Sequence, residues 1–231
     1  MVTKLPRWVE VGGFSLTLIA GSVNAIGLLG FEHQAVSHLT GTSTLLGVRL
    51  TEGNPDSVLH LALIIASFVG GAAVSGFIVQ DATLKLGRRY GVVLLLESGL
   101  LFAAMWTLTN GLIVGHLLAS AACGLQNAMA TTYSGASMRT THVSGLFTDI
   151  GIALGHVLRG IPANTRRLQL QLVLIAGFIL GGSLGAVTYR RYNYTALSVP
   201  AALALLLALI YWVYWFWVKQ AERHAINQSL E

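Results

Sequence analysis

Charged side chains are scarce in this 231-residue sequence: Asp, Glu, Lys and Arg make up 10% of it, whereas hydrophobic residues make up 54%. Soluble domains carry about 25% charged residues, so the composition excludes an ordinary soluble domain. The single cysteine, Cys123, excludes an intramolecular disulfide framework and a cysteine-based zinc site. Walker, HExxH, GxSxG and CxxC motifs are also missing, so we expect neither an enzyme nor a bound metal or cofactor.

Proline is rare as well, with four residues, but glycine is abundant, with 26. Membrane helices tolerate glycine, and small residues four apart, as at Gly71–Ser75 and Gly181–Gly185, predict close helix packing. The formal net charge of +5 would suggest a nucleic-acid partner in a soluble protein. In a membrane protein, basic loops instead set the orientation, so we expect a lipid bilayer as partner and no nucleic acid.

Six stretches are long and apolar enough to cross about 30 Å of hydrocarbon. They are residues 12–31, 58–79, 91–109, 111–131, 168–189 and 197–218. Two further segments, 33–50 and 140–157, are rich in Gly, Ser and Thr and barely long enough to cross. The positive charges decide between six and eight spans, because cytoplasmic loops carry the excess of Lys and Arg.

Six spans with a cytoplasmic N-terminus leave only Arg49, Arg190 and Arg191 outside, so 11 of the 14 basic residues lie inside. Eight spans would divide the same residues into 8 inside and 6 outside. The sequence therefore favours six spans with both termini in the cytoplasm.

An internal repeat divides the chain into two halves. SHLTGTSTLLG at 37–47 aligns without gaps with THVSGLFTDIG at 141–151. Upstream, AGSVNAI at 20–26 aligns with CGLQNAM at 123–129. Each half contains one span, a Gly/Thr motif and two further spans, and the halves are residues 12–109 and 111–218. Because three crossings per half is an odd number, the second half is inverted, which is typical of secondary transporters.

Each Gly/Thr motif predicts a re-entrant half-helix. Residues 32–39 would enter in extended form, turn at Thr40-Gly41 with Thr40 as the N-cap, and continue as a helix to about Leu50. Ten residues rise about 15 Å, which is half of the hydrocarbon core. Ser144-Gly145 of the second copy would enter from the opposite side, so that two helix N-termini meet near the membrane centre.

Helix N-termini present free amides and a positive dipole, which suit an anionic or a polar neutral solute. Hydroxyl groups and two histidines that titrate near neutrality would complete the site, with the histidines binding solute or carrying a proton. The candidate solute-binding residues are His38, Thr40, Gly41, Thr42, Thr44, His142, Ser144, Gly145, Thr148, Asn24 and Asn127. A structural alternative stays open, in which Gly and Thr allow close packing, each His caps a carbonyl and each Asn bonds the adjacent turn.

Glu97 and Asp149 are the acidic side chains expected at membrane depth, where carboxylates often belong to ion or proton pathways. Neither has a counterpart across the repeat. For Asp149, an ion pair with Arg139 is the structural alternative, and His116 is a candidate partner of Glu97.

Three segments carry a family resemblance: AGSVNAIGLLG, HLTGTSTLLG and GLQNAMATTYSGASMRTTHVSGLFTDIG. With them, residues 12–215 resemble the YoaK-like family of bacterial multi-pass inner-membrane proteins, which is largely uncharacterised. One departure is Thr40-Gly41-Thr42, where the family tends to show TGN. The resemblance implies a small bacterial inner-membrane protein, is compatible with a transporter, and brings no substrate.

We therefore predict a single all-α membrane domain over residues 1–231, with six transmembrane helices and two re-entrant half-helices in an inverted 3+3 repeat. Its predicted function is secondary transport of a small polar or anionic solute through a midplane site. A passive channel would share this fold but show no coupling to proton or sodium gradients. A non-transporting scaffold or assembly subunit is the other alternative, and a homo-oligomer is compatible with each of them.

Overall fold

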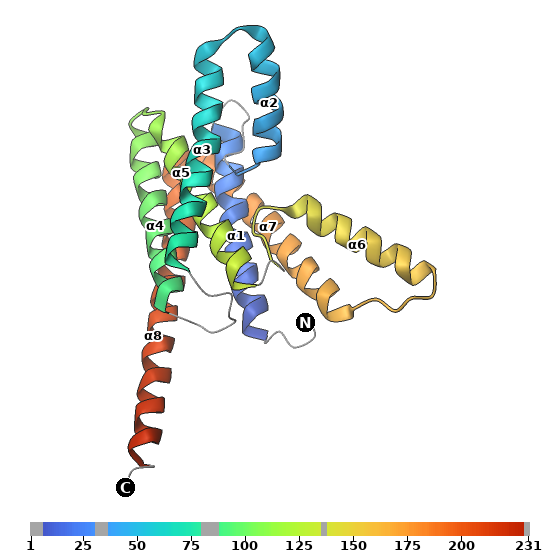
Figure 1. Ribbon diagram of the computed structural model, residues 1–231. Helices are drawn as coiled ribbons and strands as arrows, with labels where there is room; N and C mark the ends of the chain where they lie inside the picture. The colour runs from blue at the N-terminus through green and yellow to red at the C-terminus, as the bar shows by residue number, and fades with distance from the viewer. Residues whose placement is uncertain (1–6, 31–36, 80–87, 135–137, 229–231) are drawn as a thin grey trace.

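Helices account for all the regular structure in the described part of the chain, residues 7–30, 37–79, 88–134 and 138–228 of a computed structural model (Figure 1). The long helices are α1 (Arg7–Gly30), α3 (Pro55–Ile78), α4 (Arg88–Thr109), α5 (Val114–Tyr133), α7 (Thr165–Tyr192) and α8 (Ser198–Gln228). The short ones are α2 (Leu39–Glu52) and α6 (Val143–Leu158), and the 3₁₀ turn η2 (Asn193–Leu197) joins α7 to α8. The predicted all-α class is confirmed, and each long helix covers one of the six apolar stretches.

Four of the described segments are both long and apolar enough to cross a membrane. They are Val9–Gly30, Pro55–Ile78, Arg89–Thr109 and Thr165–Trp217, the last of which includes α7, η2 and much of α8. Helix α5 is less apolar because Ser120, Gln126 and Asn127 interrupt it, and these polar residues are mostly buried within the bundle.

Asparagines begin the helices that follow the two short ones. Asn54 Oδ1 accepts the Ser57 N–H at 3.2 Å at the start of α3, and Asn164 Oδ1 accepts the Arg167 N–H at 3.1 Å at the start of α7. Gly53 ends α2 at a φ of 67°, a left-handed conformation that glycine adopts without a steric cost. This turn folds α2 back along α3 (Figure 1).

Glycines bring four helices into backbone contact as two pairs, α1 with α7 and α3 with α5. A β-carbon on Gly71 of α3 would overlap the carbonyl oxygen of Ala121 on α5. A β-carbon on Gly181 of α7 would likewise overlap the carbonyl oxygen of Leu18 on α1. These buried glycines are the ones that the small-residue pattern predicts to pack helices.

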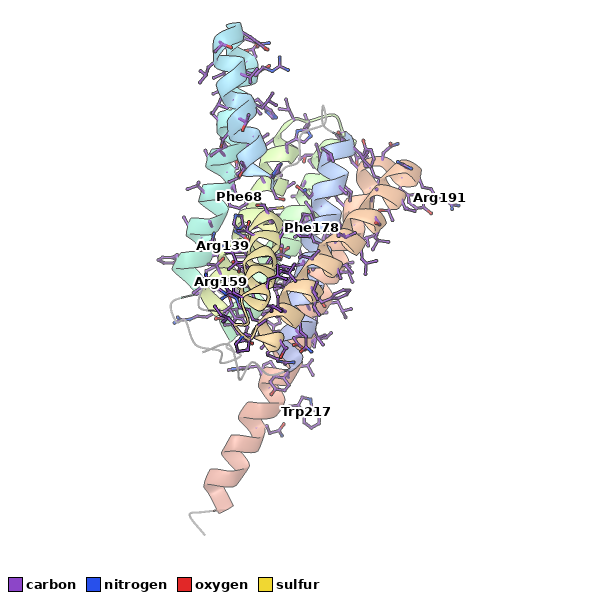
Figure 2. The ribbon with its side chains drawn as sticks, turned by 90° about the vertical axis from the view of Figure 1, so that its right-hand side faces the viewer. Phe68, Arg139, Arg159, Phe178, Arg191 and Trp217 are labelled. Atoms are coloured by element: carbon purple, nitrogen blue, oxygen red, sulfur yellow. The ribbon has the colours of Figure 1, made fainter. Side chains whose placement is uncertain are left out.

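The contacts are reciprocal in the two pairs. Gly124 of α5 faces the carbonyl of Phe68 on α3, and Gly21 of α1 faces the carbonyl of Phe178 on α7; both phenylalanines are labelled in Figure 2. Gly21 and Gly124 are aligned residues of the repeat. They therefore occupy equivalent places in two different helix pairs.

Apolar side chains fill the interior as two clusters stacked along the bundle. The first includes Leu94 of α4 and Met129 of α5, and the second includes Leu101 of α4 and Ala122 of α5. Glu97 lies between Leu94 and Leu101 along α4, so a carboxyl group is placed where the two clusters adjoin.

The short helices leave the compact part of the molecule in different directions (Figure 1). Helix α2 and the adjoining end of α3 project from one end of the bundle, and α6 leans outward from the foot of α7. The C-terminal part of α8 extends alone from the other end. Any shared site for the two motifs must therefore lie where these helices begin.

Candidate functional site

The first motif begins at a hydrogen-bonded tether to α1. Asn24 Oδ1 accepts two hydrogen bonds from Ser37, one from its backbone N–H at 3.3 Å and one from its hydroxyl at 2.7 Å. The tether holds residue 37 against the side of α1, within the bundle. Residues 31–36, which include most of the predicted descending segment, lie outside the described residues.

Helix α2 begins two residues earlier than expected, so the prediction of Thr40 as its N-cap is wrong. The His38 carbonyl accepts both the Thr42 N–H at 3.0 Å and the Thr42 hydroxyl at 3.2 Å, which starts the helical hydrogen bonding at His38. His38 is the N-cap, and its ring makes no capping hydrogen bond. Instead the ring lies over Gly41, where an added β-carbon would be 2.8 Å from Nδ1.

The second motif repeats this arrangement. Asn127 Oδ1 accepts the Thr140 N–H at 3.0 Å, and Thr140 follows Asn127 by the same 13 positions that separate Ser37 from Asn24. His142 is the N-cap of α6, again without a capping hydrogen bond, and its ring lies against Gly145. The two asparagines thus hold the turns before the motifs, which is the structural role the sequence left open.

Helix α5 brings the two tethers close together. The Cys123 thiol lies within hydrogen-bonding reach of the Ser37 hydroxyl. Asn127, which holds Thr140, follows Cys123 by four residues and therefore lies on the same face of α5, about 6 Å away. The segments that lead into the two motifs converge on this face.

The helices themselves do not meet, contrary to expectation. Among the described residues, no Cα atom of α2 lies within 8 Å of one in α6. The reason is their packing: α2 returns along α3, whereas α6 contacts α7, on the other helix pair. Of the predicted hydroxyl and histidine groups, Thr42 is buried, and the exposed ones are His38, Thr40, Thr44, His142, Ser144 and Thr148.

Glu97 is buried deep in the bundle. It is 2% exposed, and its Oε2 atom has no hydrogen-bond partner among the described residues. On α5, Cys123 is in electrostatic contact with it. His116, the partner suggested by the sequence, instead packs edge-on against His60 with ring centroids 5.8 Å apart and bonds the Ile113 carbonyl through Nδ1.

Asp149 has the structural role that the sequence left open, with a different partner. Its Oδ2 atom accepts hydrogen bonds from Arg167 at 2.8 Å and from Gln171 at 2.9 Å. Both partners belong to α7, so the ion pair fastens α6 to its neighbour. Arg139, the partner named from the sequence, is exposed and precedes α6 (Figure 2).

Three contributors to this region, Ser37, Thr140 and Cys123, are absent from the predicted site. The signal for the first two was available, because each follows an aligned asparagine by the same distance. Within the described residues, no group of three His, Cys, Asp or Glu side chains could hold a metal ion. The site is therefore a set of neutral tethers beside one isolated carboxyl group.

The comparison with known proteins places these features in a family. Residues 12–210 match the family described as "Protein of unknown function (DUF1275)". The chain belongs to this family. It is also 31% identical over 194 residues to a UPF0700 transmembrane protein of Rhizobium meliloti (strain 1021), which covers 84% of this chain and 81% of that protein. No solved structure matches the chain.

Membership confirms the resemblance to an uncharacterised family of bacterial membrane proteins. The matched region runs from near the start of α1 into α8, so the family fold includes both short helices. A transmembrane relative and apolar helices of spanning length agree in making the chain a membrane protein.

Proposed function

We propose that this protein is a secondary transporter for a small solute, built from six transmembrane helices and two re-entrant half-helices in an inverted 3+3 repeat. Transport, and not an enzymatic reaction, is the proposed activity. The observation that carries the proposal is the pair of equivalent tethers, Asn24 to Ser37 and Asn127 to Thr140. Non-helical backbone is tolerated at membrane depth only where it is buried in protein or lines a cavity. Paired interruptions in the two halves of an inverted repeat are typical of transporter sites.

The directions of the helices support the inverted repeat. Helices α1, α4 and α7 run away from the end of the bundle where the N-terminus lies, and α3, α5 and α8 run back toward it (Figure 1). Each helix of the first half is thus antiparallel to its counterpart in the second. The reciprocal glycine contacts of α1 with α7 and α3 with α5 are what a two-fold axis in the membrane plane would generate.

The length of α2 supports the half-helix assignment. Its 14 residues rise about 21 Å, whereas the 24 residues of α3 rise about 36 Å. Because α2 folds back along α3 from the turn at Gly53, it begins more than halfway along α3. In this proposal the protein lies in the bacterial inner membrane. Both termini are on the cytoplasmic side, because this orientation leaves most Lys and Arg residues inside.

The cargo in this proposal is a small polar or anionic solute near the two tethers. Hydroxyls and first-turn amides of α2 and α6 would bind it, although the separation of the two helices removes the single joint pocket. In these first turns, Thr40 and Ser144 are exposed within one chain. Polar groups at membrane depth need protein or water around them, and a homo-oligomer would supply that cover.

The proposal can be tested in proteoliposomes with three small probes, methylammonium, acetate and glycerol. We expect faster entry of one probe than in protein-free liposomes. When a pH gradient is imposed, we expect accumulation beyond that in protein-free liposomes, where methylamine and acetic acid already follow the gradient in their neutral forms. Equal entry with and without the gradient would indicate a passive channel. If the protein is folded and none of the three probes enters the proteoliposomes faster than protein-free liposomes, the result would favour a scaffold and overturn the proposal.

Replacing both His38 and His142 by alanine should lower this flux by about tenfold or more while the protein stays folded. We expect the variant to stay folded because neither histidine ring makes a capping hydrogen bond. His156→Ala is the matched control, because His156 is exposed near the C-terminal end of α6. Initial uptake rates and thermal unfolding would be compared, and undiminished uptake would reduce the two histidines to a structural role.

The six-span arrangement predicts that the α2–α3 turn and the α6–α7 loop lie on opposite sides of the membrane. Single cysteines at the exposed positions Asp56 and Ile161, in a Cys123→Ser background, should react with a membrane-impermeant maleimide from opposite faces. The native Cys123 is buried and contributes little background labelling. Labelling of both positions from one face would contradict the inverted arrangement.

A further inference from the structure

A cavity of about 360 Å³ lies between α1, α4, α5 and α8. Its walls are apolar, with Leu16 of α1, Met129 of α5 and Leu207 of α8 among them. Tyrosines from three helices, Tyr90, Tyr133 and Tyr211, add aromatic faces. The cavity is large enough for a small organic molecule.

The repeat explains why the cavity lies at this seam. Helices α4 and α5 are joined by a short turn, and Gly115 packs so closely that a β-carbon there would be 2.7 Å from Thr107 Oγ1 and 2.9 Å from the Ala104 carbonyl. The counterpart helices α8 and α1 have no such connection. Gly12, which precedes Gly115 by the repeat offset of 103 positions, lines the cavity and has no atom within 4 Å of its β-carbon position.

Two buried polar groups lie one helical turn beyond the cavity walls. Tyr90, Leu94 and Glu97 follow one another on the same face of α4, at the spacing i, i+4 and i+7. On α5, Gln126 precedes the wall residue Met129 by three positions. Among the described residues, Glu97 Oε2 and Gln126 Nε2 have no hydrogen-bond partner, and both side chains are at most 2% exposed.

We propose that this cavity binds an organic amine with an apolar body, whose ammonium group pairs with Glu97 while its body lies against the tyrosines. This inference rests on the proposed transport function but gives it a different solute, an organic cation in place of a small polar or anionic one. A buried carboxyl group attracts a cation and disfavours an anion, and tyrosine faces also attract cations. The apolar walls would bind the rest of the molecule.

Binding exchanges a proton for the amine. An isolated carboxylate is costly in the interior, so Glu97 in the empty site holds a proton. When the ammonium form of the amine arrives, the carboxyl proton leaves to water and the carboxylate pairs with the ammonium. One positive charge enters and one leaves, so the exchange couples amine movement to protons without a net change of charge. The Cys123 thiol on α5 is a titratable group near Glu97.

The test uses three molecules with the same phenyl ring and matched apolar chains: 4-phenylbutylamine, 4-phenylbutanol and 5-phenylpentanoate. Equilibrium binding to the purified full-length protein would be measured by calorimetry. We expect the amine to bind about tenfold or more tightly than the alcohol, and the carboxylate to bind most weakly. Glu97→Gln should remove the preference for the amine while leaving the alcohol's affinity unchanged.

Two glycine variants test the location. Gly12→Leu fills the cavity from a position with free space and should abolish binding of all three molecules. Gly99→Leu is the matched control, because Gly99 lies on the exposed face of α4 and also has free space around it. Thermal unfolding of each variant would confirm that it is folded.

Equal affinities for amine and alcohol, or an amine preference that survives Glu97→Gln, would overturn the inference. So would undiminished binding by Gly12→Leu. The transport proposal fails separately. If the amine binds as described but neither it nor methylammonium, acetate or glycerol is moved in proteoliposomes, transport is wrong and the site stands. If methylammonium, acetate or glycerol is moved but no amine binds, the site is wrong and transport stands.

Discussion

Gly71→Ala should leave little folded protein, whereas Gly70→Ala, one residue earlier, should fold normally. An alanine at 71 would place its β-carbon onto the Ala121 carbonyl oxygen, and backbone atoms cannot move aside as a flexible side chain can. Separating α3 from α5 along this contact should cost about 3 kcal/mol or more, well above the helix-propensity gain of about 1 kcal/mol from replacing a glycine. Gly70 is exposed and has no atom within 4 Å of its β-carbon position.

The close-packed glycine of α7 supplies an independent repetition. Gly181→Ala should disrupt α7 against Leu18 of α1 as severely, and Gly182→Ala should be tolerated because its nearest neighbour lies at 3.8 Å. The measurements are the yield of monodisperse protein after size-exclusion chromatography and the midpoint of thermal unfolding. If Gly71→Ala and Gly70→Ala unfold at the same temperature, the close α3–α5 contact is not present.

The positions of the long helices can be predicted from the sequence, because the length of each apolar stretch is sufficient to identify them. The apolar stretches 58–79 and 168–189 each lie within or close to one observed helix, α3 and α7. The differences are at the ends: α3 begins three residues earlier, at Pro55, because Asn54 caps it through the Ser57 N–H. Capping depends on a single side chain and leaves no trace in hydropathy.

For the short helices, the sequence predicts where they begin but not how they pack. Glycine and threonine spacing indicates that a helix begins near residue 40, but not which helix it packs against. The contacts of α2 with α3 and of α6 with α7 are tertiary, and they carry the two helices apart. The partner of Asp149 was missed for the same reason, since Arg167 is 18 positions away and belongs to another helix.

The tethers show what repeat alignment can predict and what it cannot. Alignment of Asn24 with Asn127 identifies two equivalent positions, and both asparagines serve the same purpose. Glu97 has no counterpart in the repeat, so alignment gives it no role. Its importance follows from burial beside a cavity, which only packing reveals. We therefore assign the proton chemistry to Glu97, a residue that the two halves do not share.

Glu97→Gln should abolish accumulation driven by a pH gradient, whereas Asp149→Asn should leave it intact. Glutamine has the shape of glutamic acid but cannot take up or release a proton, so the coupled component of uptake should fall to the level seen without a gradient. Asp149 is already paired with Arg167 and bonded by Gln171, and its side chain is 38% exposed. Losing that exposed ion pair should cost less than about 1 kcal/mol of stability.

The two acidic residues thus serve as controls for each other. Uptake of whichever probe the protein moves, methylammonium, acetate or glycerol, would be followed with and without an imposed pH gradient for both variants. Gradient-driven accumulation beyond the protein-free level that persists in Glu97→Gln would contradict a proton role for the buried carboxyl group. If Asp149→Asn loses the coupling while α6 stays folded, the proton pathway would have to be assigned to the α6–α7 contact instead. Because Glu97 Oε2 has no hydrogen-bond partner among the described residues and Asp149 has two partners, we expect the first variant alone to uncouple transport.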